Sequence, residues 1–288
     1  MDRGLVVERV AQLIRVYLPS RGKTFRGVPR GKLLRKTKVY AGDYVLGNVI
    51  DTDTFTVEEV EERKNVLVRP PVANVDRVLC VASVSAPELD PFLLDSLLVV
   101  YDHVGCDPVV LFSKVDSLTP KEREELDRWT FIYGRAGYEV LHVSAKTGEG
   151  LDKLKDLVKG EVCVLAGISG VGKSSILKAL TGEELRIEEI SFKAGRGRHT
   201  TTGVRLLPFG RGSFIGDTPG FSRVDVLRFV RRTEVKKYFR EFLSYTCRYP
   251  DCNHVGEPGC GVREGVREGE ISCERYRNYL KMIREVYS

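Results

Sequence analysis

A glycine-rich segment in the second half of the chain has the composition and spacing of a phosphate-binding loop. Residues 167–174 read G-I-S-G-V-G-K-S and fit the pattern G-x-x-x-x-G-K-[S/T]. Glycines let the backbone turn so that successive N–H groups face phosphate oxygens, Lys173 brings charge to the β and γ phosphates, and Ser174 is a ligand for Mg²⁺. A chance match is the alternative, but an apolar run at 162–166 and a helical pattern at 175–180 flank the segment as the motif requires. The predicted nucleotide-binding residues are Gly167, Ile168, Ser169, Gly170, Val171, Gly172, Lys173, Ser174 and Ser175, and Lys173 is also a predicted catalytic residue.

A second phosphate-directed motif, Asp217-Thr-Pro-Gly220, follows the short apolar run 214–216. An aspartate at a strand end can hold magnesium through water, and the N–H of Gly220 can face the γ phosphate. Alone, this sequence is a common turn. Downstream of a phosphate-binding loop, it predicts the second half of a magnesium-nucleotide site.

Two further segments are suited to reading a purine base. Guanine presents N1–H and an exocyclic amine on one edge, so one carboxylate can accept both protons, which adenine does not offer. Asp116 ends S-K-V-D after the apolar run 109–112, and Ser144-Ala-Lys146 follows 139–143. They resemble the N-K-x-D and S-A-K elements of GTPases, with Ser113 replacing asparagine. The predicted base-site residues are Ser113, Lys114, Asp116, Ser144, Ala145 and Lys146.

Four cysteines gather near the C-terminus, and three of them have metal-ligand spacing with a histidine. Cys247-x₄-Cys252-x-His254-x₅-Cys260 supplies three thiolates and one imidazole, a closed tetrahedral set for one structural Zn²⁺. Reduced, buried cysteines are the alternative interpretation. Cys273 lies in a charged helical segment and is predicted to be a packing residue.

The front of the chain predicts a small β-barrel. Residues 1–68 contain β-leaning runs at 6–17, 24–28, 43–49 and 54–60, separated by glycine-rich turns. Eight Lys and Arg residues and no acidic residue lie between 21 and 38, which indicates an RNA-binding face with Phe25 or Tyr40 stacking on bases, or else a solvated basic surface.

The rest of the chain predicts an α/β domain followed by a charged helical module. Apolar strands alternate with amphipathic helices from about residue 75, which is typical of a largely parallel sheet. The stiff junction Arg69-Pro-Pro71 marks the first boundary. The predicted domains are 1–70, an OB-like RNA-binding barrel; 71–222, a circularly permuted P-loop GTPase domain; and 223–288, a zinc-binding helical module.

The motif order is unusual, since the base elements precede the phosphate loop. This is the order of a circularly permuted GTPase, which is tolerated where the original termini lie close together. With the basic front, residues 197–202 (G-R-H-T-T-T) and the trailing Cys/His module, the chain resembles the RsgA/YjeQ family of small ribosomal subunit biogenesis GTPases over nearly its whole length. The resemblance implies GTP hydrolysis, ribosomal RNA contact and a role in late maturation of the small subunit.

The loop at 196–202 carries the candidates for hydrolysis. Among Thr200, Thr201 and Thr202, we expect Thr201 to complete the magnesium shell with Ser174. Phe221 stands where many GTPases have a water-orienting glutamine, and a phenyl ring makes no such hydrogen bond, so unassisted turnover should be slow. His199 is either the residue that orients the water or an ordinary loop histidine; the resemblance points to a catalytic role.

Composition sets the remaining expectations. The 288-residue chain has a net charge of +6 and 42% hydrophobic residues, and its apolar runs fall short of the roughly 18 residues of a membrane span. We expect a cytoplasmic monomer without membrane contact, a GTP phosphohydrolase that binds GTP or GDP with Mg²⁺ and is stimulated by the small subunit. The rival hypotheses are an RNA-binding scaffold with a structural nucleotide and a P-loop ATPase or kinase.

Overall fold

The computed structural model describes residues 1–31, 37–68, 71–182, 204–210, 212–218 and 224–284. The chain divides into two compact units. The first unit contains Met1–Val78, Leu151–Leu165 and Lys173–Pro219, and the second contains Leu79–Gly150, Ala166–Gly172 and Gly220–Ser288. Within the described ranges, no helix combines the length and the apolar character that a bilayer crossing requires.

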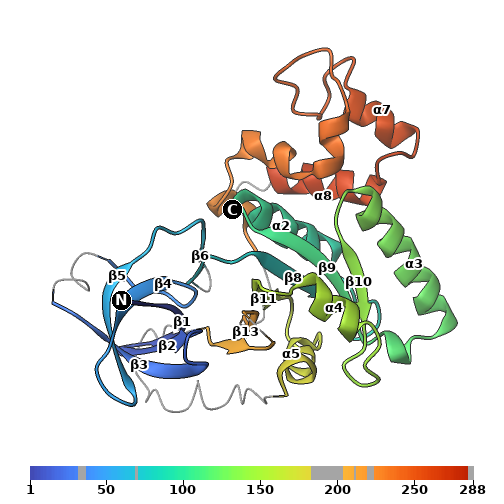
Figure 1. Cartoon of the computed structure of the whole chain (residues 1–288). Helices are drawn as coiled ribbons and strands as arrows, with labels where there is room; N and C mark the ends of the chain where they lie inside the picture. Colours follow the sequence, from blue (N-terminus) through green and yellow to red (C-terminus); the bar gives the residue numbers. More distant parts are fainter. Residues whose placement is uncertain (32–36, 69–70, 183–203, 211, 219–223, 285–288) are drawn as a thin grey trace, which may run out of the picture. The chain divides into compact units, whose positions relative to one another are not determined.

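The front of the chain is a closed barrel with the strand order β1-β2-β3-β5-β4, as the sequence predicts (Figure 1). Alternate residues point inward, so Val6, Ile14, Val16 and Phe55 are fully buried in the barrel core. Gly47 permits closure, because a Cβ there would lie 1.6 Å from the carbonyl oxygen of Thr56 on the paired strand. The strands are β1 (Asp2–Val10), β2 (Leu13–Leu18), β3 (Lys23–Pro29), β4 (Tyr44–Val49) and β5 (Thr54–Val60).

Two details of the barrel differ from the sequence interpretation. The single β-leaning run 6–17 is two strands, because the chain reverses at Ala11, where φ is +49°. Phe25, predicted to stack on bases, is only 4% exposed and belongs to the barrel core. The base-stacking role predicted for Phe25 is therefore wrong, since its inward position on β3 hides the ring.

A six-stranded sheet has the order β10-β9-β8-β11-β13-β12. The β10/β9 and β11/β13 pairs are parallel and the edge pair β12/β13 is antiparallel, which agrees with the predicted largely parallel sheet. Its strands are β8 (Arg77–Ala82), β9 (Asp107–Ser113), β10 (Val140–Val143), β11 (Val162–Ala166), β12 (Leu206–Pro208) and β13 (Phe214–Asp217); β6 (Val66–Val68) and β7 (Pro71–Ala73) form a separate pair.

Two helices of the α/β region begin at residues whose side chains accept hydrogen bonds from free backbone N–H groups. The carboxylate of Asp90 accepts from the backbone N–H groups of Phe92 and Leu93, and Thr119 and Glu122 form a reciprocal capping box. The helices of the α/β region are α2 (Pro91–His103), α3 (Pro120–Arg135), α4 (Leu151–Leu157) and α5 (Lys173–Thr181), with the short helix η1 (Val115–Ser117) between β9 and α3.

The C-terminal segment contains several helices, some of which pack on α2, all within the second unit (Figure 1). Val99 and Val100 of α2 share one apolar core with Phe239, Phe242 and Tyr279. Its elements are η2 (Val226–Arg228), η3 (Arg232–Tyr238), η4 (Arg240–Ser244), α7 (Gly261–Arg267) and α8 (Cys273–Arg284). The domain limits at 70 and 222 stay predictions.

Candidate nucleotide-binding site and metal centre

The predicted phosphate loop connects β11 to α5, so the strand–loop–helix context of the motif is present. Gly172 has a φ of +101°, a backbone conformation that favours glycine. Gly167 lies so close to β8 that a Cβ would come within 2.3 Å of the carbonyl oxygen of Val81. The glycines therefore allow both the turn and the close approach that the loop needs.

At the start of α5, a lysine, a serine and an aspartate form a polar cluster within the first unit. Lys173 is only 7% exposed, and the Ser174 hydroxyl donates a 2.9 Å hydrogen bond to Oδ2 of Asp217. Burial raises the pKa of Asp217 and lowers the pKa of Lys173, although the attraction between the two opposes both shifts.

One carboxylate oxygen of this cluster lacks a partner. Oδ1 of Asp217 is buried, and no described residue donates a hydrogen bond to it. Because the Ser174 hydroxyl gives its proton to Asp217, its oxygen lone pairs stay available to a cation. Hard oxygen ligands and an uncompensated carboxylate fit Mg²⁺.

The end of β9 holds the phosphate loop within the second unit. Ser113 Oγ lies 2.6 Å from the carbonyl oxygen of Val171 and 3.0 Å from that of Ala82, so its single proton serves one carbonyl at a time. Lys114 Nζ donates to the carbonyl oxygens of Gly170 (2.7 Å) and Ala86 (2.5 Å). A serine at position 113 is thus long enough to reach the loop directly.

We expect Ser113→Ala to weaken GTP binding about tenfold, because a buried carbonyl left without its donor costs about 1–2 kcal/mol and the loop loses a tether. The dissociation constant of a non-hydrolysable fluorescent GTP analogue measures this loss of affinity. Ser244→Ala, at an exposed serine of η4 outside the site, is the matched control. Wild-type affinity in Ser113→Ala would show that the contact does not hold the loop in its binding conformation.

The carboxylate predicted to read the base is oriented by a serine. Ser144 Oγ donates to Oδ1 of Asp116 at 2.6 Å and accepts from the backbone N–H groups of Lys146 (3.2 Å) and Thr147 (3.1 Å). This hydrogen bond from Ser144 lowers the pKa of Asp116. Asp116 is exposed and anionic at neutral pH, and it keeps lone pairs for further donors.

The predicted site residues thus fall into three groups of direct contacts: Ser113 and Lys114 with the phosphate loop, Asp116 with Ser144, and Ser174 with Asp217. Exposed positions are occupied by Lys146, Ser169, Gly170 and Ser175, whereas Ile168, Ala145 and Gly172 are half-buried. The predicted site residues His199, Thr201 and Gly220 lie outside the described residues, as does Phe221.

One contact near this site was not predicted. The hydroxyl of Thr218, a residue 2% exposed, donates a 2.7 Å hydrogen bond to the carbonyl oxygen of Leu165 on β11. This bond fixes the chain directly after Asp217. Its only signal in the sequence was the position of the threonine inside the D-x-x-G motif.

The four predicted metal ligands converge in the C-terminal segment. The side-chain ligand atoms of Cys247, Cys252, His254 and Cys260 all lie within 4.8 Å of one another. His254 Nδ1 is 3.5 Å from Cys247 Sγ and 3.4 Å from Cys260 Sγ, and the two sulfurs are 3.9 Å apart. Bonds of about 2.3 Å to sulfur and about 2.0 Å to nitrogen put the ligands of a tetrahedral zinc ion about 3.5–3.8 Å apart. The group can therefore hold a metal ion.

A glutamate that the spacing did not single out shapes the ligand loop. The Glu257 carboxylate accepts from the backbone N–H groups of Asn253 (2.8 Å), Val255 (2.9 Å) and Gly256 (3.0 Å). Burial alone would raise the pKa of Glu257, but these donors outweigh it and lower the pKa to about 2. Glu257 therefore stays anionic and organises the loop around His254.

Comparison with known proteins agrees with this geometry. The model of the family described as RsgA GTPase matches residues 60–227. The chain is 40% identical to the small ribosomal subunit biogenesis GTPases RsgA of Thermotoga petrophila, over 99% of this chain and 96% of the relative, and of Geobacillus kaustophilus, over 99% and 98%.

Solved structures show the same fold. The crystal structure of YjeQ from Thermotoga maritima superposes with a TM-score of 0.84 at 36% identity, over 99% of this chain and 98% of that one. YloQ, described as a circularly permuted GTPase, has a TM-score of 0.80 at 26% identity, over 99% and 94%. The chain therefore belongs to the RsgA GTPase family, with the circularly permuted fold that its motif order predicts.

Proposed function

We propose that this protein binds GTP with Mg²⁺, hydrolyses it, and acts in the biogenesis of the small ribosomal subunit by binding its RNA. One observation carries the nucleotide assignment. The end of β9 presents Ser113, which contacts the phosphate loop at Val171, and, three residues later, Asp116, which Ser144 orients. A single strand end thus supports both the phosphate-directed loop and the base-directed carboxylate.

Magnesium would be held by Ser174, with Asp217 beside it and Thr201 as the further ligand from the loop at 196–202. When bound, the ion supplies positive charge to the β and γ phosphates. Lys173, nearly buried and beside Asp217, neutralises the same phosphates from the helix start. His199 is the proposed orienting residue for water, and Phe221 cannot take that role by hydrogen bonding.

The barrel is the proposed RNA-binding domain. Arg26, an exposed cation on β3, offers a phosphate contact, and the half-buried ring of Tyr40 lies 4.7 Å from the guanidinium carbon of Arg63. The names of the RsgA relatives, small ribosomal subunit biogenesis GTPases, favour ribosomal RNA as the partner. The cytoplasmic location and the monomeric state stay predictions.

Zinc is the proposed metal of the Cys₃His group, because thiolates and one imidazole suit a closed tetrahedral site. We expect metal analysis of the purified protein to find about one zinc per chain, and Cys260→Ser to reduce this severalfold. Cys273→Ser, at an exposed cysteine outside the group, should keep the full content. Iron or no bound metal in the wild type would contradict the zinc assignment.

The proposed function is tested by GTP hydrolysis measured alone and with small subunits, large subunits or naked RNA. The expected result is slow hydrolysis that small subunits alone accelerate strongly. Negligible hydrolysis even with small subunits would favour an RNA-binding scaffold with a structural nucleotide. Equal rates with all partners would remove the small subunit as the specific activator.

A further inference from the structure

A cavity of about 150 Å³ lies beside the barrel within the first unit, and none of its lining residues is a predicted nucleotide-binding residue. The cavity volume is several times the roughly 30 Å³ that one water occupies in the liquid. It is lined by Arg9, Ala11, Lys38, Val39, Tyr40, Ala41, Pro71 and Val204. This lining contains two cations and no acidic side chain, so its electrostatic character is positive.

Arg9 is the unusual group of this cavity. Its Nη1 is buried, and no described residue accepts a hydrogen bond from it. Burial lowers the pKa of Arg9, but a guanidinium remains protonated in proteins. A buried cationic donor without an acceptor costs stability, so its persistence suggests a ligand that supplies the acceptor.

The acidic side chains nearest in sequence to the lining residues are already engaged. Glu8, next to Arg9 in the chain, pairs with Arg15 at 3.0 Å. Asp43 pairs with Arg63 at 2.6 Å and also accepts from the backbone N–H of Tyr40. Neither carboxylate can therefore neutralise the cavity without breaking an existing contact.

The second cation stands at an exposed position of the same lining. Lys38 is exposed, and its Nζ lies 5.4 Å from the ring centroid of Tyr40, so its compact charge can move toward an anion. The wall also includes Ala11, whose φ of +49° is uncommon for a residue with a side chain. The tight turn at Ala11 ends β1 two residues after Arg9.

We propose that this cavity is a phosphate-binding site in which Arg9 Nη1 and Lys38 Nζ hold one phosphate group. A phosphate of an RNA backbone is the source that agrees with the proposed function, on which this part of the inference rests; free phosphate offers the same chemistry. Because Arg9 Nη1 is buried whereas Lys38 is exposed, the two cations suit a phosphate group that remains attached to a chain outside the cavity.

The test compares full-length wild type with Arg9→Met, which keeps most of the aliphatic side chain and removes the guanidinium group. Arg3→Met, at an exposed arginine of β1 that lies outside the cavity and outside the basic segment 21–38, removes the same charge from the barrel. One arm measures affinity for an RNA stem-loop at several salt concentrations. The other measures the shift in melting temperature caused by inorganic phosphate, with sodium chloride at equal ionic strength as reference.

In the RNA arm, we expect Arg9→Met to bind about tenfold more weakly and to reduce the slope of log K against log salt by about one, as for one lost phosphate contact. Arg3→Met should have a clearly smaller effect. In the phosphate arm, a stabilising shift that is present in wild type and Arg3→Met but absent in Arg9→Met would assign free phosphate as a source.

The melting temperature of Arg9→Met distinguishes phosphate binding by Arg9 from a structural role. An arginine that held the fold would lower the melting temperature when removed, whereas removal of a buried donor without an acceptor should leave it unchanged or raise it. If Arg9→Met equals the control variant in both arms, the inference is overturned and the proposed RNA binding stands. If wild type does not bind the RNA, the proposed function fails. The phosphate arm alone then still shows whether the cavity binds a phosphate group.

Discussion

Replacing Asp116 with asparagine is expected to change the preferred base from guanine to xanthine. The carboxylate can accept both protons of the guanine edge, whereas an amide presents a donor to the exocyclic amine. Each charge-assisted hydrogen bond to the carboxylate contributes about 1.5–3 kcal/mol. Losing two of them in the variant should therefore weaken GTP binding by about 10²-fold or more. Xanthine has a carbonyl in place of that amine, so it accepts the hydrogen bond that the amide donates.

This variant should remain folded, since Ser144 can donate to an amide oxygen at position 116 as it does to Oδ1 of Asp116. Dissociation constants for GTP, XTP and ATP give the result directly. Asp127→Asn, at an exposed aspartate of α3, is the matched control and should bind like wild type. A substituted protein that still prefers GTP, or a wild type that prefers ATP, would refute the base assignment.

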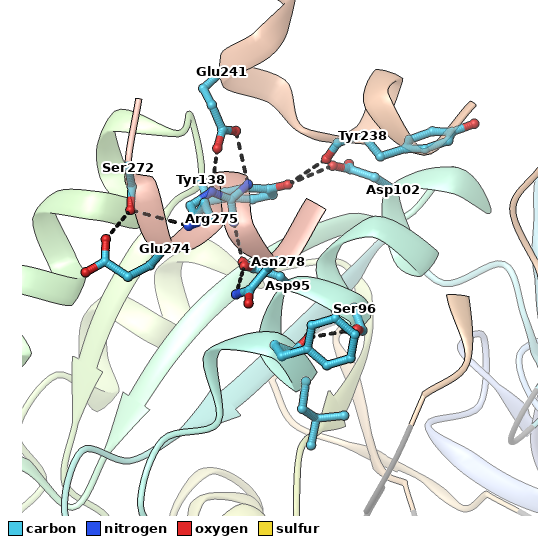
Figure 2. A network of polar contacts seen from close by, with 12 residues as sticks. Asp95, Ser96, Asp102, Tyr138, Tyr238, Glu241, Ser272, Glu274, Arg275 and Asn278 are labelled. Atoms are coloured by element: carbon cyan, nitrogen blue, oxygen red, sulfur yellow. Dashed lines mark hydrogen bonds and ion pairs between the residues drawn. The ribbon is translucent and has the colours of Figure 1, made fainter. Parts of the chain in front are cut away.

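Replacing Arg275 with leucine is expected to cause a large loss of stability. Arg275 of α8 is 1% exposed and forms a forked pair with Glu241, with Nε–Oε1 and Nη2–Oε2 distances of 2.5 and 3.0 Å (Figure 2). Its Nη1 donates to Asp95 of α2, which also accepts from Asn278 at 2.6 Å. Removing one partner of such a buried network leaves two carboxylates uncompensated, which costs about 3–5 kcal/mol.

The same variant has a pH signature. Burial raises the pKa of Asp95 to about 6, although Arg275 opposes the shift. A carboxyl group whose pKa is higher in the folded state favours folding as the pH falls from that value toward the ordinary value of about 3.9. Arg275→Leu removes the opposing cation, so the stability difference from wild type should be larger at pH 8 than at pH 5.

Urea unfolding curves give the free energy of unfolding of each variant at each pH. They are followed by the fluorescence of the single tryptophan, because Trp129 is buried in α3 within the same unit as Arg275. Arg240→Leu removes a more exposed arginine, 29% accessible, that pairs with Asp102 at 2.6 Å, and should cost less. An Arg275→Leu protein as stable as wild type at both pH values would show that the buried charges do not fasten α8 to α2.

The sequence predicted those features whose residues lie close together in the chain. The phosphate loop, the Cys/His spacing and the D-x-x-G motif are each local, and each requires particular residue types that few other structures need. The strand pattern predicted a barrel and a largely parallel sheet, because burial on one or both faces leaves a period in the sequence. The turn inside residues 6–17 was missed, where Ala11 reverses the chain without a glycine, and so were the short strands β6 and β7.

Contacts between distant residues could not be predicted in the same way. Arg275 lies in the charged helical segment around Cys273, where no neighbouring residue marks it as buried, and its partner Asp95 is 180 positions away. The contact of Ser113 with Val171 spans 58 positions and depends on how the sheet brings β9 to the loop. Phe25 shows the converse error, since an aromatic residue in a basic segment was assigned to RNA although the barrel core contains it.

The central claim is that one bound guanine nucleotide is held by the phosphate loop around Lys173 and read by Asp116. A crystal structure with a non-hydrolysable GTP analogue and Mg²⁺ tests it most directly. We predict backbone N–H groups of residues 167–174 and Lys173 Nζ on the phosphates, and the Asp116 carboxylate within about 3 Å of the guanine N1 and exocyclic nitrogens. A nucleotide bound to the loop with its base away from Asp116 would contradict the claim.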